Sequence, residues 1–125
     1  MNPELTPSKR ALGTQYEVKA TLFIEKLGYL VLDRNVNYRW GEIDLIAVDP
    51  FKSDLVFIEV RYRGENAMLT PAESITYTKQ QRLKRAIETY LVSPQFLERG
   101  LKLEGIRIDL IGFELEVISH VQSFI

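Results

Sequence analysis

Hydrophobic and polar residues follow two different periods along this chain, and the changes of period divide it into elements. Apolar positions recur every three or four residues up to Leu27, which predicts an amphipathic helix that Ser8 or Thr6 caps and Gly28 stops. The apolar stripe of this helix consists of Leu12, Tyr16, Ala20, Phe23 and Leu27.

Shorter apolar runs between turn-forming residues predict strands at 29–36, 42–48, 55–63, 106–113 and 115–121. A second helix begins between 71 and 78 and runs to about 92. The resulting order, α-β-β-β-α-β-β, predicts the α/β class with a mixed central β-sheet flanked by α-helices. The length of 125 residues fits one domain, with a flexible N-terminus at 1–7.

Two neighbouring strands of this predicted sheet each carry a carboxylate inside an apolar run, Asp44 and Glu59. A buried carboxylate is costly unless a cation or an open cleft receives it. An antiparallel register that opposes the two residues brings like charges together, and a divalent cation such as Mg²⁺ removes the repulsion. The alternative is an exposed edge pair that forms salt bridges with Arg61 and Arg63.

A third acidic residue, Glu17, lies one position off the apolar stripe of the first helix. Its small helical neighbours allow close approach to the sheet, so Glu17 can project toward the strand carboxylates; the alternative is an ordinary solvated glutamate. Asp109 lies beside Arg107 on a late strand, and this pattern indicates a structural ion pair rather than a metal ligand.

Composition narrows the chemistry. Apolar residues make up 46% and charged residues 26%, as in ordinary globular proteins. The absence of cysteine excludes disulfides and thiolate chemistry, and the single histidine gives little support to zinc or nucleophile–histidine sites. The net charge of -1 disfavours an indiscriminate polyanion binder. Positive charge is nevertheless concentrated between 74 and 87, where the alternative is a solvated helix face.

The first residues carry neither a basic start nor an apolar stretch, and no run approaches the ~20 apolar residues of a membrane span. We therefore expect a cytoplasmic protein without a membrane partner.

Several segments together resemble a known group of enzymes. The stretch from Gly41 to Asp44, the stretch from Glu59 to Arg61 and the preceding helical Glu17 resemble the PD-(D/E)XK nuclease pattern. More closely, the chain is similar to the bacterial YraN-like family of predicted endonucleases, which is related to archaeal Holliday-junction resolvases. The segments that carry this similarity, in order, are 13–20, 35–46, 56–63, 78–82 and 107–109.

The resemblance implies a restriction-endonuclease-like fold and assigns roles to four residues. Asp44 and Glu59 would be ligands of Mg²⁺ or Mn²⁺, and Glu17 a further ligand or a group that positions water. Arg61 stands in the place of the motif's lysine. Unlike lysine, arginine is always protonated in proteins, but it can stabilise the charge that develops on a phosphate.

The expected function is a Mg²⁺-dependent DNA endonuclease acting on structured or branched DNA. The alternative is a catalytically weak or inactive nuclease-fold module that binds nucleic acid or a protein partner. A homodimer is expected because a resolvase-like reaction needs two symmetric cuts. We assign the phosphate contacts, by charge and by nearness to the site, to Arg39, Arg63, Lys79 and Arg82.

Overall fold

The computed structural model describes residues 8–64 and 67–125, and the predicted flexible N-terminus at 1–7 lies outside these residues. Five strands form one sheet in the order β1-β2-β3-β4-β5, where β3 and β4 are parallel and all other neighbours are antiparallel. The strands are β1 (Leu30–Tyr38), β2 (Gly41–Asp49), β3 (Asp54–Arg63), β4 (Gly105–Glu114) and β5 (Val117–Val121).

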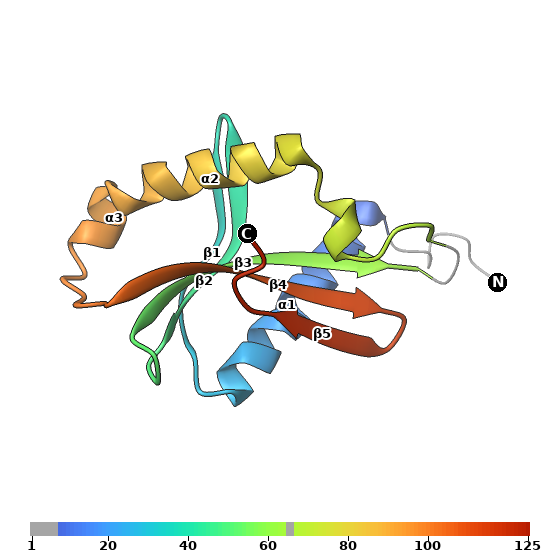
Figure 1. Ribbon diagram of the computed structural model, residues 1–125, viewed down its shortest axis with the longest axis horizontal. Helices are drawn as coiled ribbons and strands as arrows, with labels where there is room; N and C mark the ends of the chain where they lie inside the picture. Colours follow the sequence, from blue (N-terminus) through green and yellow to red (C-terminus); the bar gives the residue numbers. More distant parts are fainter. Residues whose placement is uncertain (1–7, 65–66) are drawn as a thin grey trace.

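Helices cover both faces of this sheet (Figure 1). One long helix, α1 (Lys9–Lys26), packs on one face, and the other, α2 (Tyr77–Leu91), crosses the opposite face. The short helices η2 (Ala72–Ser74) and α3 (Pro94–Leu97) flank α2 in the crossover between the parallel strands. Element order and sheet type confirm the predicted fold class. No helix in the described parts of the chain is both long and apolar enough to cross a membrane.

The ends of α1 lie where the sequence predicts them. The backbone N–H of Ala11 donates to Oγ of Ser8, and Gly28 adopts a φ of 92° just after the helix. The predicted stripe is wrong at its last position, because Ile24 is buried and Leu27 is 42% exposed. The helix ends before Leu27, so this side chain does not turn back toward the sheet.

The core has two layers, one on each side of the sheet. The layer under α1 contains Ala20, Ile24, Leu45, Ile58 and Ile111, and the layer under α2 contains Ile46, Phe57, Leu83, Ile87 and Tyr90. Side chains alternate between these layers along β3, as expected for a strand with both faces covered. A charged side chain within the covered part of the central strands therefore needs a polar partner or an opening in the packing.

The β1–β2 hairpin is longer than predicted. Pairing continues to Tyr38↔Gly41, which leaves only Arg39 and Trp40 as a two-residue turn. The hairpin tip therefore extends beyond the body of the sheet, alongside α2 (Figure 1).

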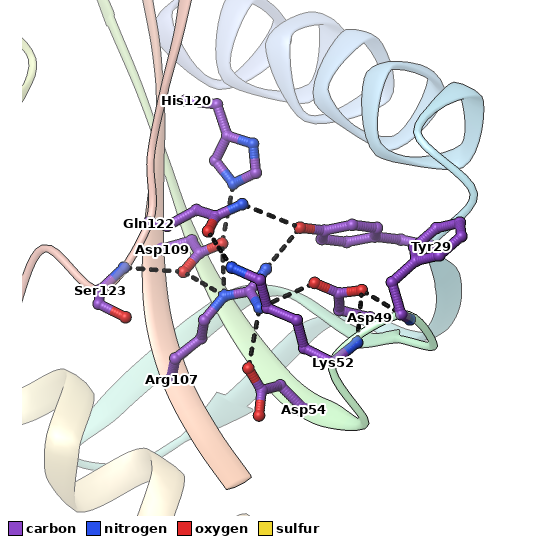
Figure 2. A network of polar contacts seen from close by, with 10 residues as sticks. Tyr29, Asp49, Lys52, Asp54, Arg107, Asp109, His120, Gln122 and Ser123 are labelled. Atoms are coloured by element: carbon purple, nitrogen blue, oxygen red, sulfur yellow. Dashed lines mark hydrogen bonds and ion pairs between the residues drawn. The ribbon is translucent and has the colours of Figure 1, made fainter.

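Arg107 on β4 is the centre of a buried polar network at the turn between β2 and β3 (Figure 2). Its Nε lies 3.0 Å from Oδ1 of Asp109, and its Nη1 lies 2.9 Å from a carboxylate oxygen of Asp49 and 3.0 Å from one of Asp54. Its Nη2 donates to the hydroxyl of Tyr29. The predicted ion pair of Arg107 with Asp109 is confirmed, within a larger network than the sequence indicated.

The same network attaches the C-terminal segment to the sheet. Asp109 is fully buried, and its Oδ2 lies 2.8 Å from Nε2 of His120 on β5. Its Oδ1 accepts a hydrogen bond of 3.1 Å from the backbone N–H of Ser123. Burial acts to raise the pKa of Asp109, but the contacts with His120 and Arg107 bring this pKa below its usual value. The network is therefore suited to keeping Asp109 ionised inside the protein.

Candidate functional site

Asp44 lies where the pairing of β1 with β2 is interrupted. Pairs form on both sides of this position, but none forms between Asn35 and Asp44. Asn35 adopts a φ of 51°, in the left-handed region that asparagine enters more readily than most residues. The main chain of Asp44 therefore has no ladder partner in β1.

The pairing of β2 with β3 also stops at this level. The last pair is Leu45↔Ile58, and continuing the same register would oppose Asp44 and Glu59. Instead the side chain of Asp44 bridges the opening, where its Oδ2 accepts a hydrogen bond of 2.8 Å from the backbone N–H of Val60. The predicted register is thus present, but the two strands separate at the two carboxylates.

Asp44 and Glu59 are each only 9% exposed and lie on central strands, which excludes the exposed edge pair. One contact of that alternative is nevertheless present, because Nη2 of Arg61 lies 2.9 Å from Oε1 of Glu59. Alternation along β3 places these two side chains on the same face of the strand.

Burial and mutual repulsion shift the protonation of these acids. Burial raises the pKa of Asp44 well above its usual value, and the negative charge of Glu59 raises it further. Burial also raises the pKa of Glu59, while the positive charge of Arg61 opposes this shift. The pKa of Glu17 is raised by burial too, against a hydrogen bond with the Asn35 side chain. Acids in a cleft whose pKa values are raised by burial and by one another's charge often belong to functional sites.

The three predicted acids open into one cleft of about 380 Å³. Glu17 reaches it from α1, Asp44 from β2 and Glu59 from β3, and Arg61 and Arg63 also line it. Glu17 belongs to the charges that raise the pKa of both strand carboxylates. The structure therefore brings together all four residues that the resemblance assigns to catalysis.

The donor set of this cleft fits a magnesium ion. Mg²⁺ prefers oxygen ligands and usually takes only one or two carboxylates, keeping water or phosphate in its other positions. Within residues 8–64 and 67–125, no three carboxylate or imidazole groups lie close enough together to hold a metal ion as a set. Asp44 and Glu59 would hold the ion, while Glu17 lines the same cleft and acts on both carboxylates through its charge.

A second hollow, a groove of about 820 Å³, lies between the β1–β2 hairpin and α2. Three of the predicted phosphate-binding residues line it, and the fourth, Arg63, lines the acidic cleft. The groove and the cleft share Glu42, Glu59 and Arg61 as lining residues, so they meet at the carboxylates. The basic residues of the groove are Arg39, Arg61, Lys79, Arg82 and Arg85.

Contacts between the hairpin tip and α2 hold this groove in shape. Nε1 of Trp40 donates a hydrogen bond of 3.2 Å to Thr89, and the guanidinium of Arg85 lies 4.6 Å from the Trp40 ring centre. The ring of Tyr38 stacks on Trp40 with a centroid distance of 6.2 Å. These aromatic side chains therefore pack within the protein and position the basic residues beside them.

Gly41 makes the closest approach of the hairpin to α2. A Cβ atom at this position would lie 2.5 Å from the carbonyl oxygen of Arg82, which belongs to the helix backbone and cannot rotate away. We expect Gly41→Ala to lower the free energy of unfolding by about 1–3 kcal/mol, the usual cost of overpacking. Gly13→Ala is the matched control, since nothing lies within 4 Å of its added Cβ and alanine stabilises a helix by about 0.5–1 kcal/mol.

Urea denaturation of both glycine variants checks this prediction. An unfolding free energy of the Gly41 variant equal to that of the wild type would show that the hairpin separates from α2 without cost.

Sequence reasoning missed two residues of this site. Asn35 interrupts the β1–β2 ladder, and its side chain acts to lower the pKa of Glu17; an asparagine within a strand was the available signal. Arg85 belongs to the basic run of α2, but only its contact with Trp40 reveals that it lines the groove.

These features define a class of protein: an α/β fold with a mixed sheet whose central strands open around an acidic cleft, beside a basic groove. The chain belongs to the family described as "Uncharacterised protein family UPF0102", whose model matches residues 16–113. The matched region includes Glu17, Asp44, Glu59 and Arg61. The predicted membership in the YraN-like family is confirmed.

Relatives in three bacteria match most of the chain. A UPF0102 protein of Marinobacter nauticus is 44% identical over 82% of this chain and 78% of its own length. One of Carboxydothermus hydrogenoformans is 37% identical over 93% of this chain and 96% of its own. One of Herpetosiphon aurantiacus is 42% identical over 95% of this chain and 97% of its own length.

Proposed function

We propose that this protein is a Mg²⁺-dependent endonuclease that hydrolyses phosphodiester bonds in DNA. The observation that carries the proposal is the opening of the sheet at Asp44 and Glu59, where two nearly buried carboxylates face one cleft. A protein gains no stability from such a pair, because burial and repulsion both disfavour the charged forms. A bound divalent ion explains why both are present.

Some residues of the site would bind the ion, and others would contact water or the phosphate of the nucleic acid. Asp44 and Glu59 would bind Mg²⁺ or Mn²⁺, which supplies Lewis-acid polarisation of the phosphate and activation of water. Glu17 would orient water on the α1 side of the cleft. Arg61 would stabilise the negative charge that develops on the phosphate, because a cation beside the reacting group offsets that charge.

The groove gives the substrate a path to the cleft. Its basic residues would neutralise consecutive phosphates, so that a nucleic-acid strand in the groove passes Glu59 and Arg61. Glu42 is the other acidic residue along the shared lining, and it is exposed. We extend the proposal to branched DNA as substrate, a homodimer as the active form and the cytoplasm as location, in keeping with the resemblance.

The test is cleavage of labelled four-way junction, flap, single-stranded and duplex DNA in Mg²⁺, in Mn²⁺ and in EDTA. We expect cleavage with either ion, none in EDTA, and none by Glu59→Gln. Glu114→Gln, which removes an exposed carboxylate at the end of β4, is the control and should cut like the wild type. If the wild type cuts none of the four substrates with either ion, the proposed hydrolysis is wrong.

One observation favours a non-catalytic nucleic-acid-binding module as the second candidate. Arg61 pairs with Glu59 and cannot release a proton as lysine can. In that case the protein binds junction DNA with the same affinity in EDTA and in Mg²⁺, and Glu59→Gln leaves the affinity unchanged. Fluorescence anisotropy with the same DNA substrates distinguishes the two functions.

A further inference from the structure

Arg61 contacts Glu59 through only part of its guanidinium group. Nη2 lies 2.9 Å from Oε1 of Glu59. Nε is buried, and in the described parts of the chain it has no hydrogen-bond acceptor. The side chain keeps 26% of its surface exposed, so it is not enclosed by packing. The contact therefore leaves a buried donor unused, while part of the side chain is open to solvent.

This contact occupies the same carboxylate that the proposed function assigns to the divalent ion. Mg²⁺ binds carboxylate oxygens at about 2.0–2.1 Å. A guanidinium held against the same carboxylate repels the ion and takes up an oxygen lone pair. Arg61 and the ion therefore compete for Glu59.

Without the ion, Arg61 is what keeps the acidic cleft compatible with the fold. Burial raises the pKa of Glu59, and the charge of Arg61 is the largest influence in the opposite direction. Among the described residues, Arg61 is the cation within ion-pair distance of either strand carboxylate. The pair thus compensates a nearly buried charge when no metal does so.

Arg61 also has a second place to bind. It lines both the acidic cleft and the basic groove. On the groove side it faces other cations, since its charge is the largest influence that lowers the pKa of Lys79, and Arg63 contributes as well. An anion entering there relieves this repulsion. The planar guanidinium with its unused Nε matches the paired oxygens of a phosphate group.

We propose that Arg61 is an exchangeable counter-cation, which pairs with Glu59 in the free protein and transfers to a phosphate of the nucleic acid, so that Glu59 is released for the divalent ion. This inference rests on the proposed function and adds to it the order in which phosphate and ion bind. Ion and phosphate bind cooperatively, and by linkage each increases the affinity for the other by the same factor. Free protein binds the ion weakly, and protein with nucleic acid binds it well.

The test is isothermal titration of Mn²⁺ into the wild type and Arg61→Gln, each with and without thymidine 3′,5′-bisphosphate. This nucleotide carries phosphate groups but no diester bond that the protein would cut. In its absence, we expect Arg61→Gln to bind Mn²⁺ roughly 10-fold more tightly, because a cation next to the ligand is gone. The bisphosphate should tighten Mn²⁺ binding to the wild type at least about 5-fold, and binding to the variant by less.

Two further variants separate charge from shape. Arg61→Lys keeps the positive charge, so without the bisphosphate its Mn²⁺ affinity should stay close to that of the wild type. Lys84→Gln removes an exposed cation of α2 that lines neither the cleft nor the groove, and it should behave like the wild type in these titrations. Titration of Mn²⁺ into the bisphosphate alone corrects for binding of the ion to the nucleotide.

The exchange is wrong if Arg61→Gln binds Mn²⁺ no more tightly than the wild type, or if the bisphosphate does not tighten Mn²⁺ binding to the wild type. In either case DNA cleavage can still support the proposed nuclease. If Arg61→Gln does not fold, the wild-type titrations with and without the bisphosphate are sufficient to support or contradict the exchange. If no protein binds Mn²⁺ under any condition, the exchange and the proposed metal site are both wrong.

Discussion

Asp44→Asn is expected to abolish metal binding and DNA cleavage while it makes the protein more stable. The amide is isosteric with the carboxylate, and its oxygen can still accept the hydrogen bond from the Val60 N–H. What disappears is a buried charge that Glu59 repels. Relieving a functional site of this kind typically raises the free energy of unfolding by about 0.5–2 kcal/mol.

The increase in the free energy of unfolding that Asp44→Asn causes should depend on pH. The folded-state pKa of Asp44 is raised, so the folded protein binds more protons than the unfolded chain and stability falls as pH rises. The destabilisation by ionised Asp44 is absent below the unfolded-state pKa of about 3.9 and complete above the folded-state pKa. The stabilisation by Asp44→Asn should therefore be small near pH 4 and reach its full value at higher pH.

Urea denaturation across pH, together with Mn²⁺ calorimetry, measures both effects. We expect the affinity of the variant for Mn²⁺ to fall at least about 100-fold, beyond the loss that outer-shell substitutions produce. Glu42→Gln is the control, because it removes an exposed carboxylate at the cleft and should change stability by less than about 0.5 kcal/mol. Unchanged Mn²⁺ affinity in Asp44→Asn contradicts the metal site.

Arg107→Met should have the opposite effect and destabilise the protein strongly. The substitution leaves Asp49 and Asp109 buried without their main counter-charge, since both are bonded to Arg107 in the wild type. Removing one partner of a buried ion network costs about 3–5 kcal/mol. It also releases the hydroxyl of Tyr29, which Arg107 contacts. The cleft lies beyond the other end of the β2–β3 ladder, so metal binding by the folded fraction should persist.

The pH dependence of the unfolding free energy shows whether the ion pairs of Arg107 have been lost. In the wild type the pKa values of Asp49 and Asp109 lie below their usual range, so the stability they contribute is present above the unfolded pKa of about 3.9 and is lost as pH falls through the folded-state pKa. In Arg107→Met, both carboxylates lose the contact with Arg107 that opposes the effect of burial, so both pKa values rise and the gain of stability with rising pH is lost. The difference in unfolding free energy should therefore widen from pH 4 to pH 7.

Arg99→Met is the matched control for denaturation. Arg99 lies 3.1 Å from Asp33, but its side chain is 33% exposed, and exposed ion pairs contribute at most about 1 kcal/mol. If Arg107→Met and Arg99→Met lower the free energy of unfolding equally, the buried Arg107 network stabilises the protein no more than an exposed ion pair does.

The sequence alone determined the elements and the identity of the acids. The period of apolar residues, the Ser8 cap and Gly28 located α1, and alternating runs located the strands to within about two residues. Asp44 and Glu59 were recognisable because a carboxylate inside an apolar run conflicts with burial. Arg107 and Asp109 were recognisable as partners because their side chains lie on the same face of one strand.

Only the tertiary structure decided what these residues contact. The left-handed Asn35, the end of the β2–β3 ladder at Leu45↔Ile58 and the position of Arg61 between the cleft and the groove depend on how separate segments pair and pack, which no local pattern encodes. Local periodicity determines which face a side chain occupies, because it follows from backbone geometry. Which other segments it meets on that face depends on how strands and helices pack, and this is why the position of Arg61 between the acidic cleft and the basic groove became visible only in the folded protein.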